Sequence, residues 1–158
     1  PRSPYFESKK VGEEEFLRLR GGVVLRISSP YGDGLPANIV LGRFIERAKK
    51  GLPIVVWGSG KREQDFVSTS DVATAIEAAL TSRSEGVFNI AAGEPTTMLD
   101  LAHQISAITR APLHLAGQPD PSEFERIRIS VSKAKAQLAW APVIDLASWI
   151  RSQLGNYE

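Results

Sequence analysis

Two residues near the start of the chain, Tyr5 and Lys9, have side chains and a spacing that could carry acid–base chemistry. They follow Ser3, a good helix N-cap, and Pro4, which suits the first position of a helix. On a helix, residues four apart share one face about one turn from each other. An ammonium beside a tyrosine hydroxyl stabilises the phenolate, so this pair could exchange a proton with a substrate. The same spacing is also typical of an ordinary surface pair, and this segment alone leaves both interpretations open.

The spacing of apolar residues indicates which elements would position this pair. A helix is predicted over residues 4–20, because a favourable N-cap opens it and two glycines end it. Residues 23–28 form a nearly continuous apolar run, which is typical of a buried strand in a parallel sheet. The turn-rich stretch 28–34 then lies at the carboxyl end of that strand, where ligands bind in open α/β sheets. A plain connection between strand and helix is the alternative.

Helical and extended patterns alternate through the rest of the chain. Helices are predicted over residues 36–50, 71–81 and 97–110 and after Asp145, and extended segments over residues 54–57, 64–69, 86–91, 113–116 and 126–131. Residues 58–61 are predicted to form a hairpin turn. Ser70, Thr97 and Asp145 are predicted to cap the starts of the three helices after it. The alternation indicates an α/β fold with a mostly parallel sheet and a small mixed α/β lobe.

Composition excludes several classes of protein. The 158 residues suffice for one domain with a core of ordinary size, and 42% of them are hydrophobic. A net charge of +1 gives no electrostatic reason to expect nucleic acid or a membrane as a partner. The absence of cysteine excludes disulfides and fits a cytoplasmic location. The sequence shows no cluster of metal ligands and no apolar run of membrane-spanning length.

The Tyr-x-x-x-Lys spacing at a helix start resembles the catalytic motif of the short-chain dehydrogenase/reductase superfamily. The downstream sequence resembles the extended branch of that superfamily, the NAD-dependent epimerase/dehydratase family, which acts on nucleotide sugars. The matching stretches are Asn38-Ile39, Gly58-Ser59-Gly60, Asp65-Phe66-Val67, Asp71-Val72-Ala73 and Ser132-Lys133-Ala134. The chain departs from the family pattern at Ser29, where the family has Asn, at Gln64, where it has Arg, and at Ser130, where it has Asp.

The resemblance covers nearly the whole chain but only the second half of a family member. It implies that residues 1–35 and about 70–92 belong to a Rossmann-type sheet, while about 36–69 and 93–158 largely build a substrate-binding lobe. The chain opens with Pro1, and its single methionine is Met98, so we expect a fragment, a processed product or a shortened chain. In such enzymes the first helix contacts a second subunit, so a homodimer through residues 4–20 is expected.

The resemblance also assigns roles around a cofactor. Tyr5 and Lys9 would be the catalytic pair, with Tyr5 exchanging the proton of a sugar hydroxyl and Lys9 holding the nicotinamide ribose. Ser28 and Pro30 would join them in contacting NAD or NADP in the complete enzyme. The sequence has no Gly-x-Gly-x-x-Gly or Gly-x-x-Gly-x-x-Gly loop to hold the dinucleotide phosphates. We therefore expect no cofactor to bind to this chain alone.

A second set of residues is expected to bind the substrate. These residues are Ser29, Asn38, Ile39, Arg62, Gln64 and Arg128. Gln64 stands where the family arginine grips the substrate diphosphate, and Arg62 lies on the same side of an extended strand, so Arg62 could take over that contact. Arg128 would be the second phosphate contact. An exposed hairpin arginine is the alternative for Arg62, and a simple helix cap is the alternative for Asn38.

The function that these features favour is that of the substrate-binding, Tyr/Lys-bearing half of an NAD(P)-dependent nucleotide-sugar epimerase or dehydratase. Two alternatives remain. The chain could be a catalytically inactive module that holds a nucleotide sugar or a protein partner. It could also belong to a reductase of the same family whose substrate carries no nucleotide, because three family positions differ here.

Overall fold

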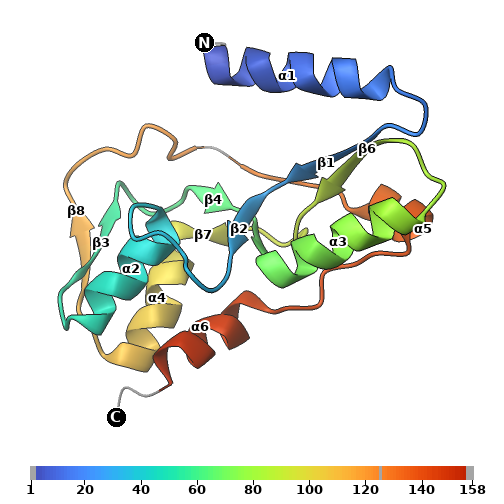
Figure 1. The fold of residues 1–158 in the computed structure, drawn as a ribbon. Helices are drawn as coiled ribbons and strands as arrows, with labels where there is room; N and C mark the ends of the chain where they lie inside the picture. Colours follow the sequence, from blue (N-terminus) through green and yellow to red (C-terminus); the bar gives the residue numbers. More distant parts are fainter. Residues whose placement is uncertain (1–2, 125, 156–158) are drawn as a thin grey trace.

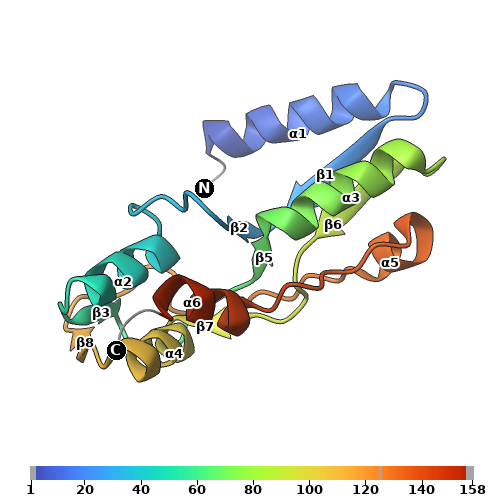
Figure 2. The same cartoon turned by 60° about the horizontal axis from the view of Figure 1, so that its bottom comes forward.

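The computed structural model describes residues 3–124 and 126–155 of the chain (Figure 1). One end of the molecule is built on a parallel strand pair, β1 (Val23–Ile27) and β6 (Gly86–Ile90). Helices α3 (Thr69–Thr81) and α5 (Ser132–Leu138) pack on one face of this pair, and α1 (Pro4–Leu17) lies along the other (Figures 1 and 2). The core at this end includes Phe88, Ile90, Ala134, Leu138 and Trp140.

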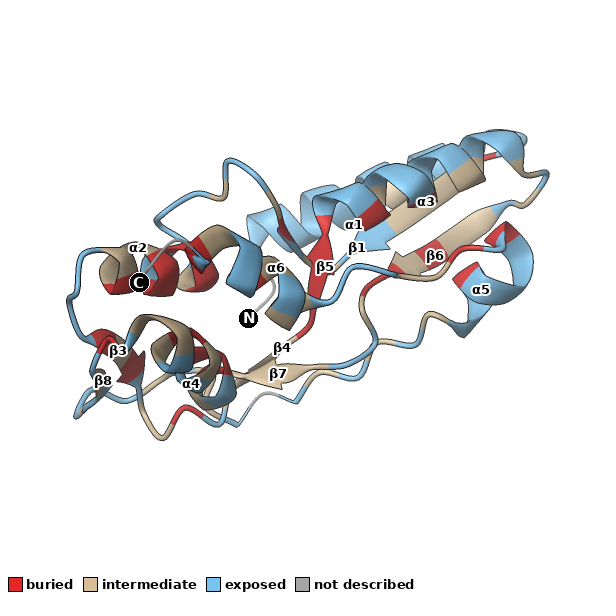
Figure 3. Ribbon diagram, turned by 90° about the horizontal axis from the view of Figure 1, so that it is seen from below, coloured by how far each residue is buried: buried red, intermediate tan, exposed pale blue. Residues whose placement is uncertain are grey.

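The other end is a helical layer over a second parallel pair. Strands β3 (Ile54–Trp57) and β8 (Leu113–Ala116) pair in parallel. Helices α2 (Val40–Lys49) and α4 (Met98–Thr109) pack with these strands, and α6 (Leu146–Leu154) packs against α4 (Figures 1 and 3). Their shared core includes Leu41, Phe44, Ile54, Leu101, Ile105 and Ile150. This helical layer supports one side of the candidate site described below.

Four short strands connect the two ends. Strand β2 (Ser29–Tyr31) pairs in parallel with β5 (Phe66–Ser68), and β4 (Glu63–Gln64) pairs antiparallel with β7 (Thr96–Thr97). Asp65, between β4 and β5, is only 1% exposed. Its carboxylate accepts hydrogen bonds from Ser28 Oγ at 3.0 Å, Ala92 N at 2.8 Å and Gly93 N at 2.8 Å. This buried carboxylate therefore joins the ends of β1 and β6 to the connecting strands.

Three of the predicted helix caps, at Ser3, Thr97 and Asp145, are confirmed. Ser3 accepts a hydrogen bond from Phe6 N, and Thr97 accepts one from Asp100 N. Asp145 caps α6 in the same way by accepting from Ser148 N at 2.8 Å. These side chains satisfy amide groups that have no partner inside the helix.

The predicted hairpin after residue 57 is wrong. Strand β3 pairs with the distant β8, while the predicted return strand is divided into β4 and β5, which pair with β7 and β2. The turn needs Gly60, because its φ is +71° and an added Cβ would lie only 2.8 Å from Leu99 Cβ. Helix α3 also begins earlier than predicted, because Ser68, not Ser70, accepts the hydrogen bond from Asp71 N at 2.9 Å.

Three other expectations need correction. Residues 126–131 do not form a strand, and α2 begins at Val40 rather than at residue 36. Strand β1 is not buried: its side chains are half-buried or exposed, and Ile27 is 43% exposed. In the described residues, β1 has β6 as its one strand partner, so its other edge is uncovered. Among the helices that the structure describes, none is both long enough and apolar enough to cross a membrane.

Candidate functional site

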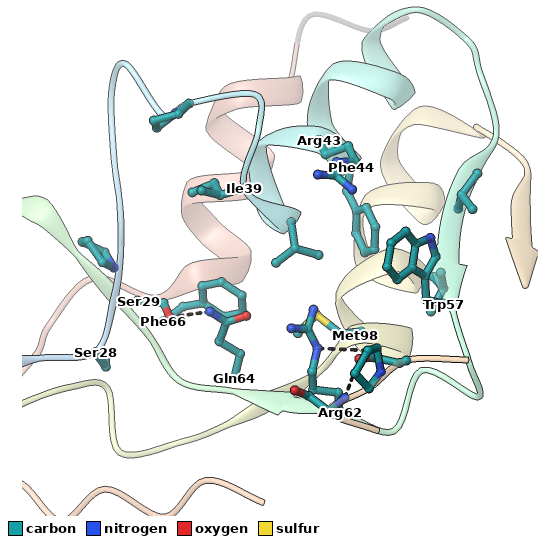
Figure 4. Close-up of a pocket in the computed structure, with 18 residues that line it drawn as sticks. Ser28, Ser29, Ile39, Arg43, Phe44, Trp57, Arg62, Gln64, Phe66 and Met98 are labelled. Atoms are coloured by element: carbon teal, nitrogen blue, oxygen red, sulfur yellow. Dashed lines mark hydrogen bonds and ion pairs between the residues drawn. The ribbon is translucent and has the colours of Figure 1, made fainter. Parts of the chain in front are cut away.

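A pocket of about 710 Å³ lies at the carboxyl end of β1, between helix α2 and strand β4 (Figure 4). We call it the α2 pocket. Its apolar wall includes Ile39, Phe44, Trp57, Phe66 and Met98. Its polar lining includes Ser28, Ser29, Arg43, Arg62, Gln64 and Asp120. A cavity of this size, with a few polar groups set in an apolar wall, is typical of a binding site for a small organic ligand.

Arg62 immediately precedes β4, and its side chain points toward the middle of the α2 pocket (Figure 4). Its Nε lies 3.1 Å from Asp120 Oδ2, and the two side chains are 29% and 10% exposed. The alternative of an exposed hairpin arginine therefore does not describe Arg62. An arginine that is partly shielded from water attracts an anion more strongly than a fully exposed one, because the local dielectric is lower.

Gln64 also faces the α2 pocket, two residues after Arg62 and on the same side of β4, as the strand alternation predicts. Its Nε2 donates a hydrogen bond to Ser29 Oγ at 2.5 Å (Figure 4). Two of the three residues that differ from the family pattern, Ser29 and Gln64, are thus in contact with each other. They form a neutral pair that connects β4 to β2.

Arg43 and Trp57 line the α2 pocket although the sequence analysis did not select them. Arg43 is on α2, and its Nη2 donates to the backbone carbonyl of Asn38 at 3.1 Å. The signal that could have identified Arg43 is its position four residues after Ile39, which puts both on one helix face. Trp57 ends β3 and is 45% exposed, which is unusual for so large an apolar side chain unless it meets a ligand or partner.

Two predicted substrate residues, Asn38 and Arg128, do not line the α2 pocket. Asn38 adjoins it but is exposed. Arg128 lies on the other side of β4, where its Nη1 is 2.6 Å from Glu63 Oε2. The hydrogen bond from Arg128 is the main reason why the pKa of Glu63 lies below its ordinary value. Arg126 pairs with the same carboxylate, at 3.6 Å from Oε1. Arg128 could reach a ligand in the pocket only by leaving Glu63.

The catalytic candidates Tyr5 and Lys9 line a second, open pocket of about 970 Å³ between α1 and β1. We call it the α1 pocket. Lys9 Nζ lies 5.4 Å from the centroid of the Tyr5 ring, so the predicted neighbourhood of the two groups is present. Tyr5 is 66% exposed. On the same helix, Glu13 Oε2 is 2.6 Å from Arg26 Nη2, and that hydrogen-bonded contact lowers the pKa of Glu13.

The proposed cofactor residues are divided between the two pockets. Tyr5 and Lys9 line the α1 pocket, whereas Ser28 and Pro30 line the α2 pocket. The two pockets are lined by consecutive residues at the end of β1: Ile27 lines the α1 pocket, and the next residue, Ser28, lines the α2 pocket. A ligand long enough to pass this point would contact both sets of residues.

The model of the NAD dependent epimerase/dehydratase family matches residues 1–91, which is more than half of the chain. The chain belongs to this family. A putative UDP-glucose 4-epimerase of Methanocaldococcus jannaschii is 34% identical over 163 residues, covering 96% of this chain and 52% of that relative. The dTDP-4-dehydro-6-deoxyglucose reductase of Escherichia coli is 30% identical, covering 87% of this chain and 47% of that relative.

Solved structures agree with this assignment to the epimerase/dehydratase family. The UDP-glucose 4-epimerase of Thermotoga maritima, solved with UDP-glucose, superposes with a TM-score of 0.84 at 28% identity, over 98% of this chain and 53% of that one. The UDP-glucose 4-epimerase of Thermus thermophilus, solved with NAD, gives a TM-score of 0.82 at 28% identity, over 99% of this chain and 54% of that one. The predicted family and the predicted Rossmann-type α/β fold are confirmed. The chain spans about half the length of the curated relatives that it matches.

Proposed function

We propose that this chain is the substrate-binding, Tyr/Lys-bearing part of an NAD(P)-dependent epimerase or dehydratase that acts on a nucleotide sugar. The observation that carries the proposal is the composition of the α2 pocket: an aromatic and apolar wall with two arginines at the carboxyl end of β1. An aromatic wall offers a face for a nucleobase, and guanidinium groups match phosphate oxygens in charge and geometry.

In this proposal the nucleotide occupies the α2 pocket and the sugar points toward the α1 pocket. The phosphates lie near Arg62, with Arg43 as a second cation, and the base packs against Trp57. The sugar passes the junction at Ile27 and Ser28 and reaches the hydroxyl of Tyr5. The relative from Thermotoga maritima, which was solved with UDP-glucose, supports this class of ligand.

The residues of the α1 pocket fit the nicotinamide end of a dinucleotide, because a phenol and an ammonium are exposed together beside the end of β1. The cofactor would supply hydride exchange at a sugar carbon. Tyr5 would exchange the proton of the sugar hydroxyl, and Lys9 would favour the phenolate form and donate hydrogen bonds to ribose hydroxyls. The phosphates of the cofactor need a grip that this sequence does not contain, so we propose that another polypeptide segment provides it.

The uncovered edge of β1 is the proposed docking site for that segment. Ser28 N donates to Ile90 O, and Gly22 O accepts from Gly86 N, so alternate residues of β1 bond to β6. The N–H of Leu25 therefore points away from β6 and is open to a further strand. Helix α1 has no buried residue and exposes Phe6, Val11 and Phe16, so it can be covered both by that segment and by a second subunit.

Calorimetric titration with UDP-, GDP- and dTDP-sugars tests the proposal. We expect one of them to bind to the chain alone and NAD to give no detectable heat. Replacing Arg62 by Met should weaken binding of the nucleotide sugar about tenfold or more, because a charge-assisted contact with phosphate is lost. Arg151→Met, which removes an exposed arginine of α6, is the matched control and should leave the affinity unchanged. Equal affinities for both variants, with native circular dichroism spectra, would refute the assignment of the pocket.

The contact between Ser29 and Gln64 favours one alternative, a reductase of the same family with a less anionic substrate. Where the family has a cation, this chain has a neutral amide, and one of its two N–H donors is already bonded to the Ser29 hydroxyl. The same titration separates the two proposals. Binding of a non-nucleotide sugar or hydroxy compound, together with no response to any nucleotide sugar, would favour the reductase.

A further inference from the structure

Asp120 places a carboxylate inside a pocket that otherwise suits an anion. Among the described residues that line the α2 pocket, Asp120 carries the one carboxylate, and Arg43 and Arg62 carry the two cations. The Asp120 side chain is only 10% exposed, and its Oδ2 is 3.1 Å from Arg62 Nε. A negative charge this close to the proposed phosphate contact must affect which anions the pocket accepts.

The carboxylate is held in place by its surroundings. Asp120 Oδ1 accepts a hydrogen bond from Ser122 N at 2.9 Å. The loop that carries Asp120 is tied to the turn after β3, because Gly58 N donates to Gln118 O and Ser59 N donates to Glu123 Oε1, each at 2.8 Å. Each oxygen of Asp120 thus has a partner, and the loop is bonded to the turn after β3 on either side of Asp120. The carboxylate would have to break these contacts to leave the pocket when a ligand enters.

We propose that Asp120 is a specificity residue that disfavours free nucleoside diphosphates and so selects for nucleotide sugars. This inference rests on the proposed function. In a nucleotide sugar both phosphates are esterified, and each carries one negative charge. In a free nucleoside diphosphate the terminal phosphate can lose a second proton near pH 6, which adds a third charge at neutral pH. The fixed carboxylate repels every phosphate charge, so it penalises the three charges of the free diphosphate more than the two charges of the sugar diester.

Weaker binding of free nucleoside diphosphates would reduce their competition with the substrate. The free nucleoside diphosphate has the same base and ribose as the substrate and would compete for the same wall of the pocket. A pocket built from cations alone would hold the more highly charged competitor more tightly. A carboxylate beside Arg62 weakens that preference for any base, because it repels the additional charge of the terminal phosphate.

Calorimetric titration with matched ligand pairs tests the inference: UDP-glucose and UDP, GDP-mannose and GDP, dTDP-glucose and dTDP. Asp120→Asn keeps an oxygen for Ser122 N but removes the charge. At pH 7.5 we expect this variant to gain about five- to tenfold more affinity for the free diphosphate than for the sugar diester, because two like charges a few ångströms apart repel by about that amount when water screens them. Glu77→Gln, on α3 at the other end of the molecule, makes the same change in net charge and should leave the ratio of the two affinities unchanged.

A second measurement compares the chain and the variant at several pH values. Between pH 5.5 and pH 7.5 the terminal phosphate loses its proton, and the ratio of the two affinities should shift toward the free diphosphate less in the unaltered chain than in Asp120→Asn. A shift that is the same in the chain and in folded Asp120→Asn would overturn the inference while leaving the nucleotide-sugar site standing. If neither the chain nor the variant binds any of the six ligands, the proposed function itself fails.

Discussion

Asp65 offers the sharpest test of how the two ends of the molecule are joined. Its side chain is buried, and its carboxylate accepts three hydrogen bonds. Oδ1 accepts the hydrogen bonds from Ser28 Oγ and Ala92 N, and Oδ2 accepts the one from Gly93 N. Replacing Asp65 by Asn changes neither the size nor the shape of the side chain. It removes the charge and puts an NH₂ group where one oxygen accepted a bond.

The cost of Asp65→Asn can be worked out from these contacts. In the better amide orientation, the remaining oxygen keeps the bonds from Ser28 and Ala92, but the NH₂ group faces Gly93 N, which is also a donor. A lost bond to a charged acceptor costs about 1.5–3 kcal/mol, and the two retained bonds each weaken by about 1 kcal/mol when the acceptor becomes neutral. Because a neutral amide is easier to bury than a carboxylate, part of this cost is offset. We expect the free energy of unfolding to fall by about 2–4 kcal/mol.

Urea unfolding followed by circular dichroism and tryptophan fluorescence measures the change at pH 7. Asp33→Asn is the matched control, since Asp33 is exposed and, within the part of the chain that the structure describes, its carboxylate accepts one long hydrogen bond, from Gln153 Nε2 at 3.5 Å. That variant should differ from the unaltered chain by no more than about 0.5 kcal/mol. If Asp65→Asn falls in the same narrow range, the carboxylate does not hold the connecting strands in the way described here.

Three further predictions concern single residues. Burial raises the pKa of Tyr31 to about 12 in the folded chain. Because this pKa is higher than in the unfolded chain, the free energy of unfolding should be unaffected by Tyr31 up to about pH 10 and should fall between pH 10 and 12. In urea titrations at a series of pH values, Tyr31→Phe should remove that part of the fall. Gly60→Ala should lower the free energy of unfolding, measured by thermal unfolding, by about 2–4 kcal/mol, because φ is +71° and the new Cβ would lie 2.8 Å from Leu99 Cβ. Gly34→Ala is the control: φ is +77° but nothing lies within 4 Å of the new Cβ, so the free energy of unfolding should fall by only about 1–2 kcal/mol. Amide hydrogen exchange measured by NMR should be faster at Leu25 than at its two neighbours; equal protection would show that the outer edge of β1 is covered.

The sequence predicted those parts of the fold that depend on neighbouring residues. The caps at Ser3, Thr97 and Asp145 are local, since each side chain bonds an amide three residues later. The hairpin after Trp57 failed because a Gly-rich turn is compatible with several continuations of the chain. The partner that β3 takes is β8, far along the sequence, and nothing in the spacing of residues 54–69 indicates it.

The candidate site shows the same limit. Strand alternation correctly put Arg62 and Gln64 on one side of β4. Asp120 was missed because it lies in the loop after β8 and meets Arg62 only through the pairing of β3 with β8. Arg128 was expected at the substrate, but the structure pairs it with Glu63. Glu63 is the neighbour of Gln64 on β4, so its side chain faces away from the side of β4 that lines the α2 pocket. Side-chain partners across distant segments cannot be read from periodicity.

The parallel strand pairs also bear on how the chain folds. Val23 pairs with Gly86 and Ile54 with Leu113, so each pair must close a long loop before it gains any stability. Proteins dominated by such distant contacts fold slowly, typically in milliseconds to seconds. Because the pairing of β3 with β8 brings Asp120 to Arg62, the complete α2 pocket exists only in chains in which these two strands have paired. A ligand of this pocket that is added during refolding therefore stabilises those chains and no others.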